Sequence, residues 1–275
     1  MSTVSQDATR EHRITAPSLA RRKQRGEPIS MLTAYDYPFA RIFDAAGIDV
    51  LLVGDSLGNV VQGQSTTLPV TLEETVYHTR LVSRAAARAL VVADLPFGSY
   101  QISEQDAVRS AVRCIKEGGA HAVKLEGGVA MAPTIARIAR AEIPVMGHVG
   151  LTPQSVHRMG GHRVQGRSEQ GARRVLEDAH AVQDAGAFAV VLEGMPAELA
   201  RRVTAELSIP TIGIGAGVGC DGQVLVMHDM LGLSEWTPGF VKAYANLGAL
   251  ASQAARRFAE EVAKRKFPGE EHSYR

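Results

Sequence analysis

The most regular feature of the sequence is a series of short apolar runs. In the clearest cases a helix-like stretch ends in glycine, an apolar run follows, and an acidic residue closes the run. Eight segments contain such a run: 29–36, 45–56, 88–96, 117–128, 141–150, 184–195, 207–217 and 222–229. Near-continuous apolar runs of this length are typical of parallel strands that are buried on both faces.

Amphipathic stretches lie between most of the apolar runs and predict helices. They cover residues 71–88, 104–117, 129–141, 168–185 and 196–206. Strands alternating with helices across one domain favour an α/β fold, a (β/α)8 TIM barrel. A doubly wound open sheet is the rival, and the even count of eight strands favours closure. The seventh and eighth strands are so close in sequence that the helix between them is expected to be short or missing.

The two ends of the chain add to this pattern. Residues 16–25 predict an extra N-terminal helix ahead of the barrel, and residues 240–264 predict the last barrel helix, extended. Residues 1–12 are polar and are expected to be flexible. Because no interdomain linker is recognisable, residues 1–275 are expected to form a single barrel domain.

Composition narrows the class of protein. Lys and Arg number 30 and Asp and Glu number 29, so neither nucleic acid nor an anionic membrane is expected as a partner. The longest apolar runs are about a strand long, too short to span a membrane, and the N-terminus lacks the apolar core of a signal peptide. Cys114 and Cys220 share no metal-type spacing and are expected to be free thiols. Together these features predict a cytoplasmic protein.

Ionisable side chains follow several of the predicted strands at the point where each strand ends. They are Asp55, Asp94, Lys124, Glu126, His148 and Glu193. Strand side chains alternate in direction, so Lys124 and Glu126 share a face, and in a barrel both would point into its mouth. Aligning the repeated segments places Glu193 at the position of Glu126, whereas Val191 stands where Lys124 does.

Acids that converge in a partly buried place lose hydration and repel one another, which a bound cation or a raised pKa relieves. Oxygen ligands favour a hard ion such as Mg²⁺, and Lys124 suits an anionic substrate. The alternative for any one acid is a helix cap or a loop ion pair, and the two readings are about even. Several acids and a lysine at equivalent strand ends favour a metal site for a small anion.

Two long connections and the histidines are less specific. Residues 54–70 and 148–167 leave the carboxyl ends of strands and predict binding loops or lids. His148, His157 and His162 fall in one region, but their spacing matches no zinc motif. His148 is a candidate hydrogen-bonding residue of the site. The glycine-rich stretch GIGAGVG matches no phosphate-binding motif and is expected to form a tight turn near the substrate.

Seven blocks of sequence in order resemble the ketopantoate hydroxymethyltransferase family (3-methyl-2-oxobutanoate hydroxymethyltransferase). They include LLVGDSLGNVVQGQSTT, VVADLPFGSY, AVKLEGG, PVMGHVGLTPQSVHRMGGHRVQGR, AGAFAVVLEGMP, IPTIGIGAGVGCDGQVLVMHDMLG and FPGEEHSY. The likeness runs from about residue 12 to the C-terminus. It implies a TIM barrel of the phosphoenolpyruvate/pyruvate type.

The resemblance also implies an activity: transfer of a one-carbon unit from 5,10-methylenetetrahydrofolate to 3-methyl-2-oxobutanoate, giving 2-dehydropantoate. This is the first committed step of pantothenate biosynthesis. The implied assembly is a homo-oligomer, commonly a decamer built from pentameric rings, with one Mg²⁺ per subunit. The rivals are a lyase of the same barrel group acting on another keto acid, and a non-catalytic metabolite-binding or assembly module.

The resemblance assigns roles to individual residues. Asp55 and Asp94 are implied metal ligands, also in contact with the substrate, and Glu126 belongs to the metal shell directly or through water. Ser56 and Lys124 are implied contacts of the keto acid, and Glu193 is the implied proton acceptor. In physical terms the metal acts as a Lewis acid, Glu193 deprotonates C3, and the resulting enolate attacks the methylene carbon. This chain carries Gly194 where the family has a non-glycine residue, which predicts a small local change in the loop.

Overall fold

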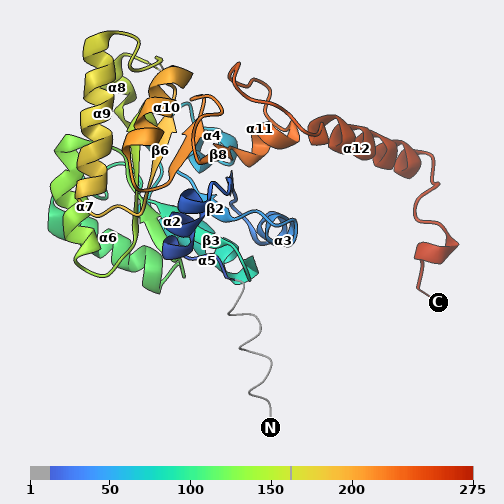
Figure 1. The fold of residues 1–275 in the computed structure, drawn as a ribbon. Helices are drawn as coiled ribbons and strands as arrows, with labels where there is room; N and C mark the ends of the chain where they lie inside the picture. The colour runs from blue at the N-terminus through green and yellow to red at the C-terminus, as the bar shows by residue number, and fades with distance from the viewer. Residues whose placement is uncertain (1–12, 162, 275) are drawn as a thin grey trace. The chain divides into compact units, whose positions relative to one another are not determined.

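The computed structural model of the chain describes residues 13–161 and 163–274, so the expected flexibility of residues 1–12 lies outside the described residues. Eight parallel strands form a closed barrel in sequence order (Figure 1). They are β1 Ile29–Thr33, β2 Val50–Val53, β3 Leu90–Asp94, β4 Ala122–Lys124, β5 Val145–Gly150, β6 Ala189–Glu193, β7 Thr211–Ile214 and β8 Gly222–Leu225. The predicted closed barrel is confirmed, and the rival open sheet is wrong.

Helices connect most of the strands and cover the barrel. The helices of the barrel unit are α2 Ala16–Arg25, α3 Tyr37–Ala45, α4 Leu57–Val60, α5 Leu72–Ala85, α6 Glu104–Lys116, α7 Ala132–Ala139, α8 Val156–Met159, α9 Glu169–Asp184 and α10 Ala197–Glu206. Short 3₁₀ turns, η1 Val129–Met131 and η2 Pro153–Ser155, precede α7 and α8. The five helices predicted between strands are all present. No helix lies between β7 and β8, as expected from their short connection.

Short polar side chains fix where the helices begin. Thr71 starts α5 with a capping box, in which its hydroxyl accepts from the backbone N–H of Glu74 and the Glu74 carboxylate accepts from that of Thr71. Ser103 caps α6 and Ser168 caps α9. In each case the serine side-chain oxygen accepts a hydrogen bond from a backbone N–H of the first turn, without the reciprocal bond of a capping box. The loops before α5, α6 and α9 therefore lead into helices with a defined start.

The strands alternate their side chains between two apolar layers. One layer consists mainly of strand residues that fill the barrel, and the other also contains residues of α6, α7, α9 and α10. In β4, Ala122 belongs to the inner layer, whereas Val123 and Leu125 pack with the helices. Continuing the alternation turns Lys124 and Glu126 toward the barrel interior. The predicted shared face of these two residues is therefore the inner one.

The predicted N-terminal helix is present as α2 and covers the amino ends of the strands. Its Leu19 is fully buried in the same cluster as the barrel interior. Two ion pairs hold the helix there: Arg22 Nη1 lies 2.7 Å from Asp49 Oδ2, just before β2, and Lys23 Nζ lies 2.8 Å from Asp221 Oδ2, just before β8. This end of the barrel is closed, which leaves the carboxyl end for a site.

Contacts divide the chain into two compact units, Met1–Val226 and Met227–Arg275. The second unit holds α11 Met227–Leu231, α12 Leu247–Ala263 and the 3₁₀ turn η3 Glu270–His272. α12 begins at residue 247, later than predicted, because the Asn246 side chain caps it by accepting from the N–H of Ala249. None of its residues is buried. The single domain expected over 1–275 stays a prediction.

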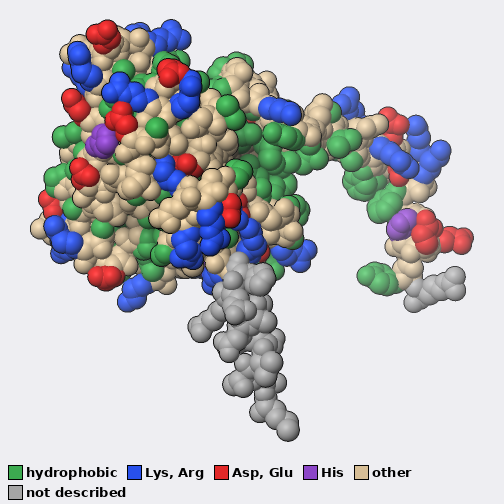
Figure 2. Space-filling model, in the orientation of Figure 1, with side chains coloured by type: hydrophobic (Ala, Val, Ile, Leu, Met, Phe, Trp, Pro, Cys, Tyr) green, Lys and Arg blue, Asp and Glu red, His purple; other side chains and the backbone are tan. Residues whose placement is uncertain are grey.

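The surface carries charges of both signs. Figure 2 shows basic and acidic side chains interspersed over the visible face of the barrel unit, in keeping with the nearly balanced composition. Within residues 13–161 and 163–274, no helix combines the length and apolarity that a membrane crossing requires.

Candidate active site

The carboxyl ends of neighbouring strands bring the predicted residues together. Asp94 is the last residue of β3 and pairs in register with Lys124, the last residue of β4. Glu193 ends β6, and His148 lies within β5, two residues before the partner of Glu193 in the sheet register. Strand ends at one mouth of a closed barrel point into a common space. The structure thus places the sequence-predicted side chains at the end of the barrel opposite α2.

Asp94 and Lys124 form a buried ion pair. Lys124 Nζ lies 2.6 Å from Asp94 Oδ2, and the two side chains are only 5% and 2% exposed. Burial raises the pKa of Asp94 to about 7, although Lys124 opposes this shift. Burial lowers the pKa of Lys124, but the surrounding carboxylates outweigh this effect and raise it overall. The lysine therefore stays charged at neutral pH, whereas burial brings the pKa of Asp94 to about 7.

Glu126, His148 and Glu193 form a second group beside this pair. His148 Nδ1 lies 3.6 Å from Glu126 Oε1, and His148 Nε2 lies 3.1 Å from Glu193 Oε2, at an angle that does not qualify as a hydrogen bond. Burial lowers the pKa of His148, and the charge of Lys124 adds to this effect. A neutral imidazole therefore separates the two carboxylates.

Negative charge exceeds positive charge in this space. Asp55, Asp94 and Glu126 are buried, and among residues 13–161 and 163–274 Lys124 is the one buried lysine or arginine. Burial and the nearby Asp55 raise the pKa of Glu126 well above its usual range. Such crowding of carboxyls is relieved either by protons or by a bound cation.

Asp55 and Ser56 follow β2 and begin the segment that leads into α4. Asp55 is buried, and its Oδ2 accepts a hydrogen bond of 2.9 Å from the side-chain amide of Gln154. Ser56 Oγ lies 2.8 Å from the hydroxyl of Tyr35 and is half-buried, so it can face a ligand above the barrel. Asp55 lies where the repeat pattern placed it, just after a strand, and Ser56, which the family resemblance added, comes next in the chain.

Two residues of the site were missed by the sequence reasoning. Gln154, in the long loop after β5, and Tyr100, in the loop after β3, are both buried and hydrogen-bonded to each other at 2.8 Å. The sequence prediction rests on ionisable groups at strand ends, and neither residue is ionised at neutral pH. The signal that could have found Gln154 is its place in a loop already predicted to be a binding loop.

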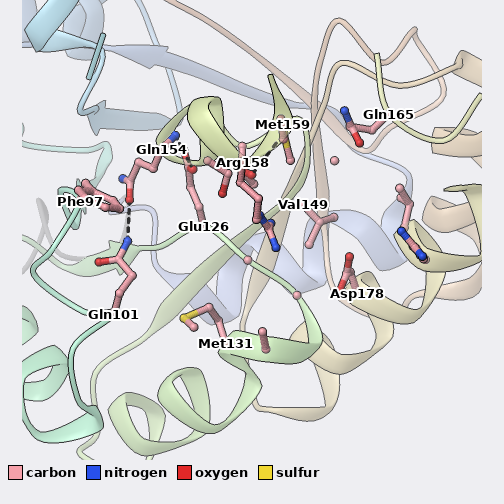
Figure 3. A pocket seen from close by; sticks show the side chains of 18 of the residues that line it. Phe97, Gln101, Glu126, Met131, Val149, Gln154, Arg158, Met159, Gln165 and Asp178 are labelled. Atoms are coloured by element: carbon pink, nitrogen blue, oxygen red, sulfur yellow. Dashed lines mark hydrogen bonds between the residues drawn. The ribbon is translucent and has the colours of Figure 1, made fainter. Parts of the chain in front are cut away.

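A cavity of about 570 Å³ opens next to Glu126. Figure 3 shows Glu126, Arg158 and Gln154 at its wall, with Gln154 joined to Gln101 by a hydrogen bond of 3.1 Å. Apolar side chains such as Met131 complete the lining. Its volume is in the range of small-molecule sites.

The remaining sequence predictions concern two histidines, Gly194 and the glycine-rich stretch GIGAGVG. His157 lies exposed on α8, and His162 lies outside the described residues. Gly194 adopts φ 57°, a left-handed conformation that glycine adopts without strain, directly after Glu193. In GIGAGVG, a Cβ at Gly217 would lie 2.4 Å from the Cβ of Ala197, so glycine there allows close packing on α10.

The donor set fits a hard divalent cation. Within residues 13–161 and 163–274, no three histidine, cysteine or carboxylate side chains are arranged to hold a metal by themselves. Mg²⁺ does not require that, because it usually takes one or two carboxylates and completes its shell with water or substrate oxygens. Asp94 Oδ1 and Glu126 Oε1 are buried without a hydrogen-bond partner among the described residues. Buried carboxylate oxygens of this kind are suitable ligands, directly or through water.

Sequence comparison relates the chain to one family of enzymes over almost its whole length. The family model described as ketopantoate hydroxymethyltransferase matches residues 13–270. A 3-methyl-2-oxobutanoate hydroxymethyltransferase of Trichlorobacter lovleyi is 59% identical over 95% of this chain and 98% of its own. The proteins of the same name from Geobacter sulfurreducens and Moorella thermoacetica are each 58% identical, over 94% and 96% of this chain and 98% of their own.

Structural comparison finds the same fold in solved structures whose sequences are only distantly similar. Phosphoenolpyruvate phosphomutase from Streptomyces platensis is 16% identical with a TM-score of 0.61, covering 92% of this chain and 88% of that one. 2,3-Dimethylmalate lyase is 20% identical with a TM-score of 0.57, covering 94% and 87%. Phosphonopyruvate hydrolase in complex with oxalate and Mg²⁺ is 12% identical with a TM-score of 0.60, covering 94% and 93%. These likenesses show that the chain shares the barrel fold of these proteins.

Proposed function

Because the chain belongs to the ketopantoate hydroxymethyltransferase family, we propose that it transfers a one-carbon unit from 5,10-methylenetetrahydrofolate to 3-methyl-2-oxobutanoate, giving 2-dehydropantoate. The chain is a hydroxymethyltransferase by this membership. The identity of the folate donor, the Mg²⁺ ion and the place in pantothenate biosynthesis as its first committed step are parts of the proposal.

The observation that carries the proposal is the solvent exposure of the Glu193 side chain. Its side chain is 17% exposed, whereas those of Asp94 and Glu126 are 2% and 3% exposed. A base that removes a carbon-bound proton must reach the substrate and later release the proton to water. Among these acids, Glu193 combines that access with a position at the mouth of the barrel. We therefore assign it as the proton acceptor from C3 of the keto acid.

The substrate's carboxylate and keto group would be bound on the other side of the same space. Lys124 carries the positive charge that an anionic keto acid needs, and Ser56 offers a hydroxyl in the segment that follows β2. Asp55 and Asp94 would hold the Mg²⁺, with Glu126 in its shell directly or through water. When bound, the ion would polarise the keto group and lower the pKa of the C3–H bond. A structural neighbour in complex with oxalate and Mg²⁺ supports this choice of ion.

The residues then act in a simple order. Lys124 and Ser56 orient the keto acid so that C3 faces Glu193, and Glu193 takes the proton. The carbanion at C3 bonds to the methylene carbon of the donor, and the two bonds from that carbon to N5 and N10 both break. The proton taken from C3 and one proton of a water molecule pass to these nitrogens, which gives tetrahydrofolate, and the water's remaining hydroxyl bonds to the methylene carbon. Neither substrate supplies the hydroxyl oxygen of the product, so the balance requires one water molecule. The cavity beside Glu126 offers space for part of the folate donor.

Replacing Asp94 tests the metal assignment. Metal binding requires an ionised carboxylate, and the pKa of Asp94 is about 7, so Mg²⁺ affinity should rise with pH from 6 to 8. Asp94→Ala should weaken Mg²⁺ binding roughly 100-fold at pH 8 and flatten this pH dependence, because a ligand is lost. Calorimetric titration measures both effects. Asp184→Ala, at an exposed position ending α9, serves as the control. An unchanged affinity in Asp94→Ala would remove it from the metal shell.

A direct assay tests the function as a whole. The purified chain should form 2-dehydropantoate from 3-methyl-2-oxobutanoate and 5,10-methylenetetrahydrofolate when Mg²⁺ is present, and exchange the C3 proton with solvent even without folate. Cleavage of oxaloacetate or isocitrate in place of this transfer would favour a lyase. Binding of the keto acid with neither exchange nor transfer would favour a non-catalytic barrel.

The cellular location and the oligomeric state of the enzyme are also parts of the proposal. We place it in the cytoplasm as a homo-oligomer, and a decamer is the size that the family resemblance implies. Exposed apolar side chains in the second unit support self-association, among them Trp236, Tyr244, Leu250, Phe258 and Val262. Light scattering that shows a monomer at micromolar concentration would contradict the oligomer.

A further inference from the structure

Gln154 is the most fully hydrogen-bonded side chain of the site. It is 5% exposed, in η2 of the loop after β5. Its Nε2 donates to Asp55 Oδ2 at 2.9 Å and to the backbone carbonyl of Leu95 at 3.0 Å. Its Oε1 accepts from the Tyr100 hydroxyl at 2.8 Å and from Gln101 Nε2 at 3.1 Å. The two N–H donors and the two acceptor positions of the amide are therefore all used.

The partners fix which way the amide faces. The carbonyl of Leu95 can only accept a hydrogen bond, so the NH₂ group must point toward it and toward Asp55. The amide oxygen then faces the two donors, Tyr100 and Gln101. Glutamate in the same place would set an oxygen against Asp55 and Leu95, so the site distinguishes glutamine from its acid counterpart.

The backbone of the same residue reaches a second carboxylate. The Gln154 N–H donates to Glu126 Oε2 at 3.0 Å, while Glu126 Oε1 stays buried without a hydrogen-bond partner among the described residues. Tyr100 also accepts from the Glu126 N–H at 3.2 Å. One residue thus binds one oxygen of Asp55 and one oxygen of Glu126, across the strand ends of β2 and β4. The other oxygen of each carboxylate is left for a ligand.

We propose that Gln154 is a positioning residue for the divalent cation: it orients Asp55 and Glu126 so that their remaining oxygens face the ion or its waters. This inference rests on the metal site of the proposed function and adds a residue that touches no metal itself. Partners that orient metal ligands in this way typically change metal affinity about 10–100-fold when they are removed.

Gln154→Met tests the proposal, because methionine has a similar length and lacks the amide. In the absence of both substrates, calorimetric titration should show Mg²⁺ binding about 10–100-fold weaker than in the wild type. The matched control is Gln165→Met in the same connection, since the Gln165 amide donates to the carbonyl of Arg163 and to no carboxylate. Its Mg²⁺ affinity should equal that of the wild type.

Tyr100→Phe provides a second variant in case the first does not fold. It removes the hydroxyl that holds Gln154 Oε1 and should weaken Mg²⁺ binding in the same direction, by several-fold. The double variant should lose less affinity than the sum of the two single losses, because both act through one network.

The outcomes separate this inference from the function on which it rests. Normal Mg²⁺ affinity in folded Gln154→Met and in Tyr100→Phe would overturn the positioning role and leave the metal site standing. If these variants lose thermal stability but keep their Mg²⁺ affinity, the positioning role is also overturned, because Gln154 then has a structural role alone. A wild-type chain that binds no Mg²⁺ would overturn the metal site and this inference together.

Discussion

Glu193→Gln should bind 3-methyl-2-oxobutanoate nearly as well as the wild type, yet exchange its C3 proton about 10³-fold more slowly, within the range that general base catalysis contributes. The amide has the size of the carboxylate but cannot accept a proton. The side chain lies at the end of β6, partly exposed, with the His148 imidazole 3.1 Å away. Substitution therefore removes the base with little change in shape. Loss of the C3 proton signal in D₂O, followed by NMR, measures the rate.

The exchange reaction isolates this step because it needs only the keto acid and the metal. Glu177→Gln, an exposed position on α9, is the matched control and should exchange at the wild-type rate. If Glu193→Gln also exchanges at that rate, another group is the base. If it exchanges slowly but also fails to bind the keto acid, Glu193 has a binding role in place of a catalytic one.

The fold was predictable because its signals are local and repeated. Each strand carries its own apolar run, and most of the helices between strands carry their own amphipathic pattern. Eight such runs alternating with amphipathic stretches favour a closed barrel. The start of α12 was predicted too early, because residues 240–246 continue the apolar pattern while the cap at Asn246 decides the boundary. Such a cap depends on one side chain and is easily missed in a long pattern.

The site was predictable only where strand geometry controls it. Alternation alone placed Lys124 and Glu126 on one face, and the repeat placed Glu193 at an equivalent strand end. Gln154 could not be found in this way, because its partners come from three other segments and depend on the path of a long loop. The distinct roles of Lys124, Glu126 and Glu193 came from the family resemblance, and the geometry is compatible with them without testing them.

Lys124→Met should produce the largest loss of stability in the site. Breaking a buried ion pair costs about 3–5 kcal/mol when the remaining charge stays unpaired. The remaining charge here is Asp94, whose pKa is already raised to about 7 by burial, and removing Lys124 raises it further. An acid with a raised pKa in the folded state favours folding at low pH, and this advantage is lost as the pH rises through that pKa. The variant should therefore be nearly as stable as the wild type at pH 6 and clearly less stable at pH 8.

Urea unfolding of the metal-free protein at the two pH values measures this difference. Lys116→Met, exposed at the end of α6, is the control and should be close to wild type at both. Adding Asp94→Asn should restore stability at pH 8, since the unpaired carboxylate is then gone. If the two losses simply add in the double variant, Lys124 and Asp94 are not energetically coupled.

The same variant separates the structural role of Lys124 from the role in substrate binding that we propose for it. At pH 6 a protonated Asp94 compensates for the missing cation in the folded protein, but nothing replaces the cation that the proposal sets against the substrate's carboxylate. A hydrogen bond to a charged group is worth about 1.5–3 kcal/mol, so affinity for 3-methyl-2-oxobutanoate should fall roughly 10–150-fold even where stability is normal. Calorimetric titration of Lys124→Met with the keto acid at pH 6 measures this affinity. Wild-type affinity there would confine Lys124 to balancing the buried acids and would leave the substrate's charge to another group.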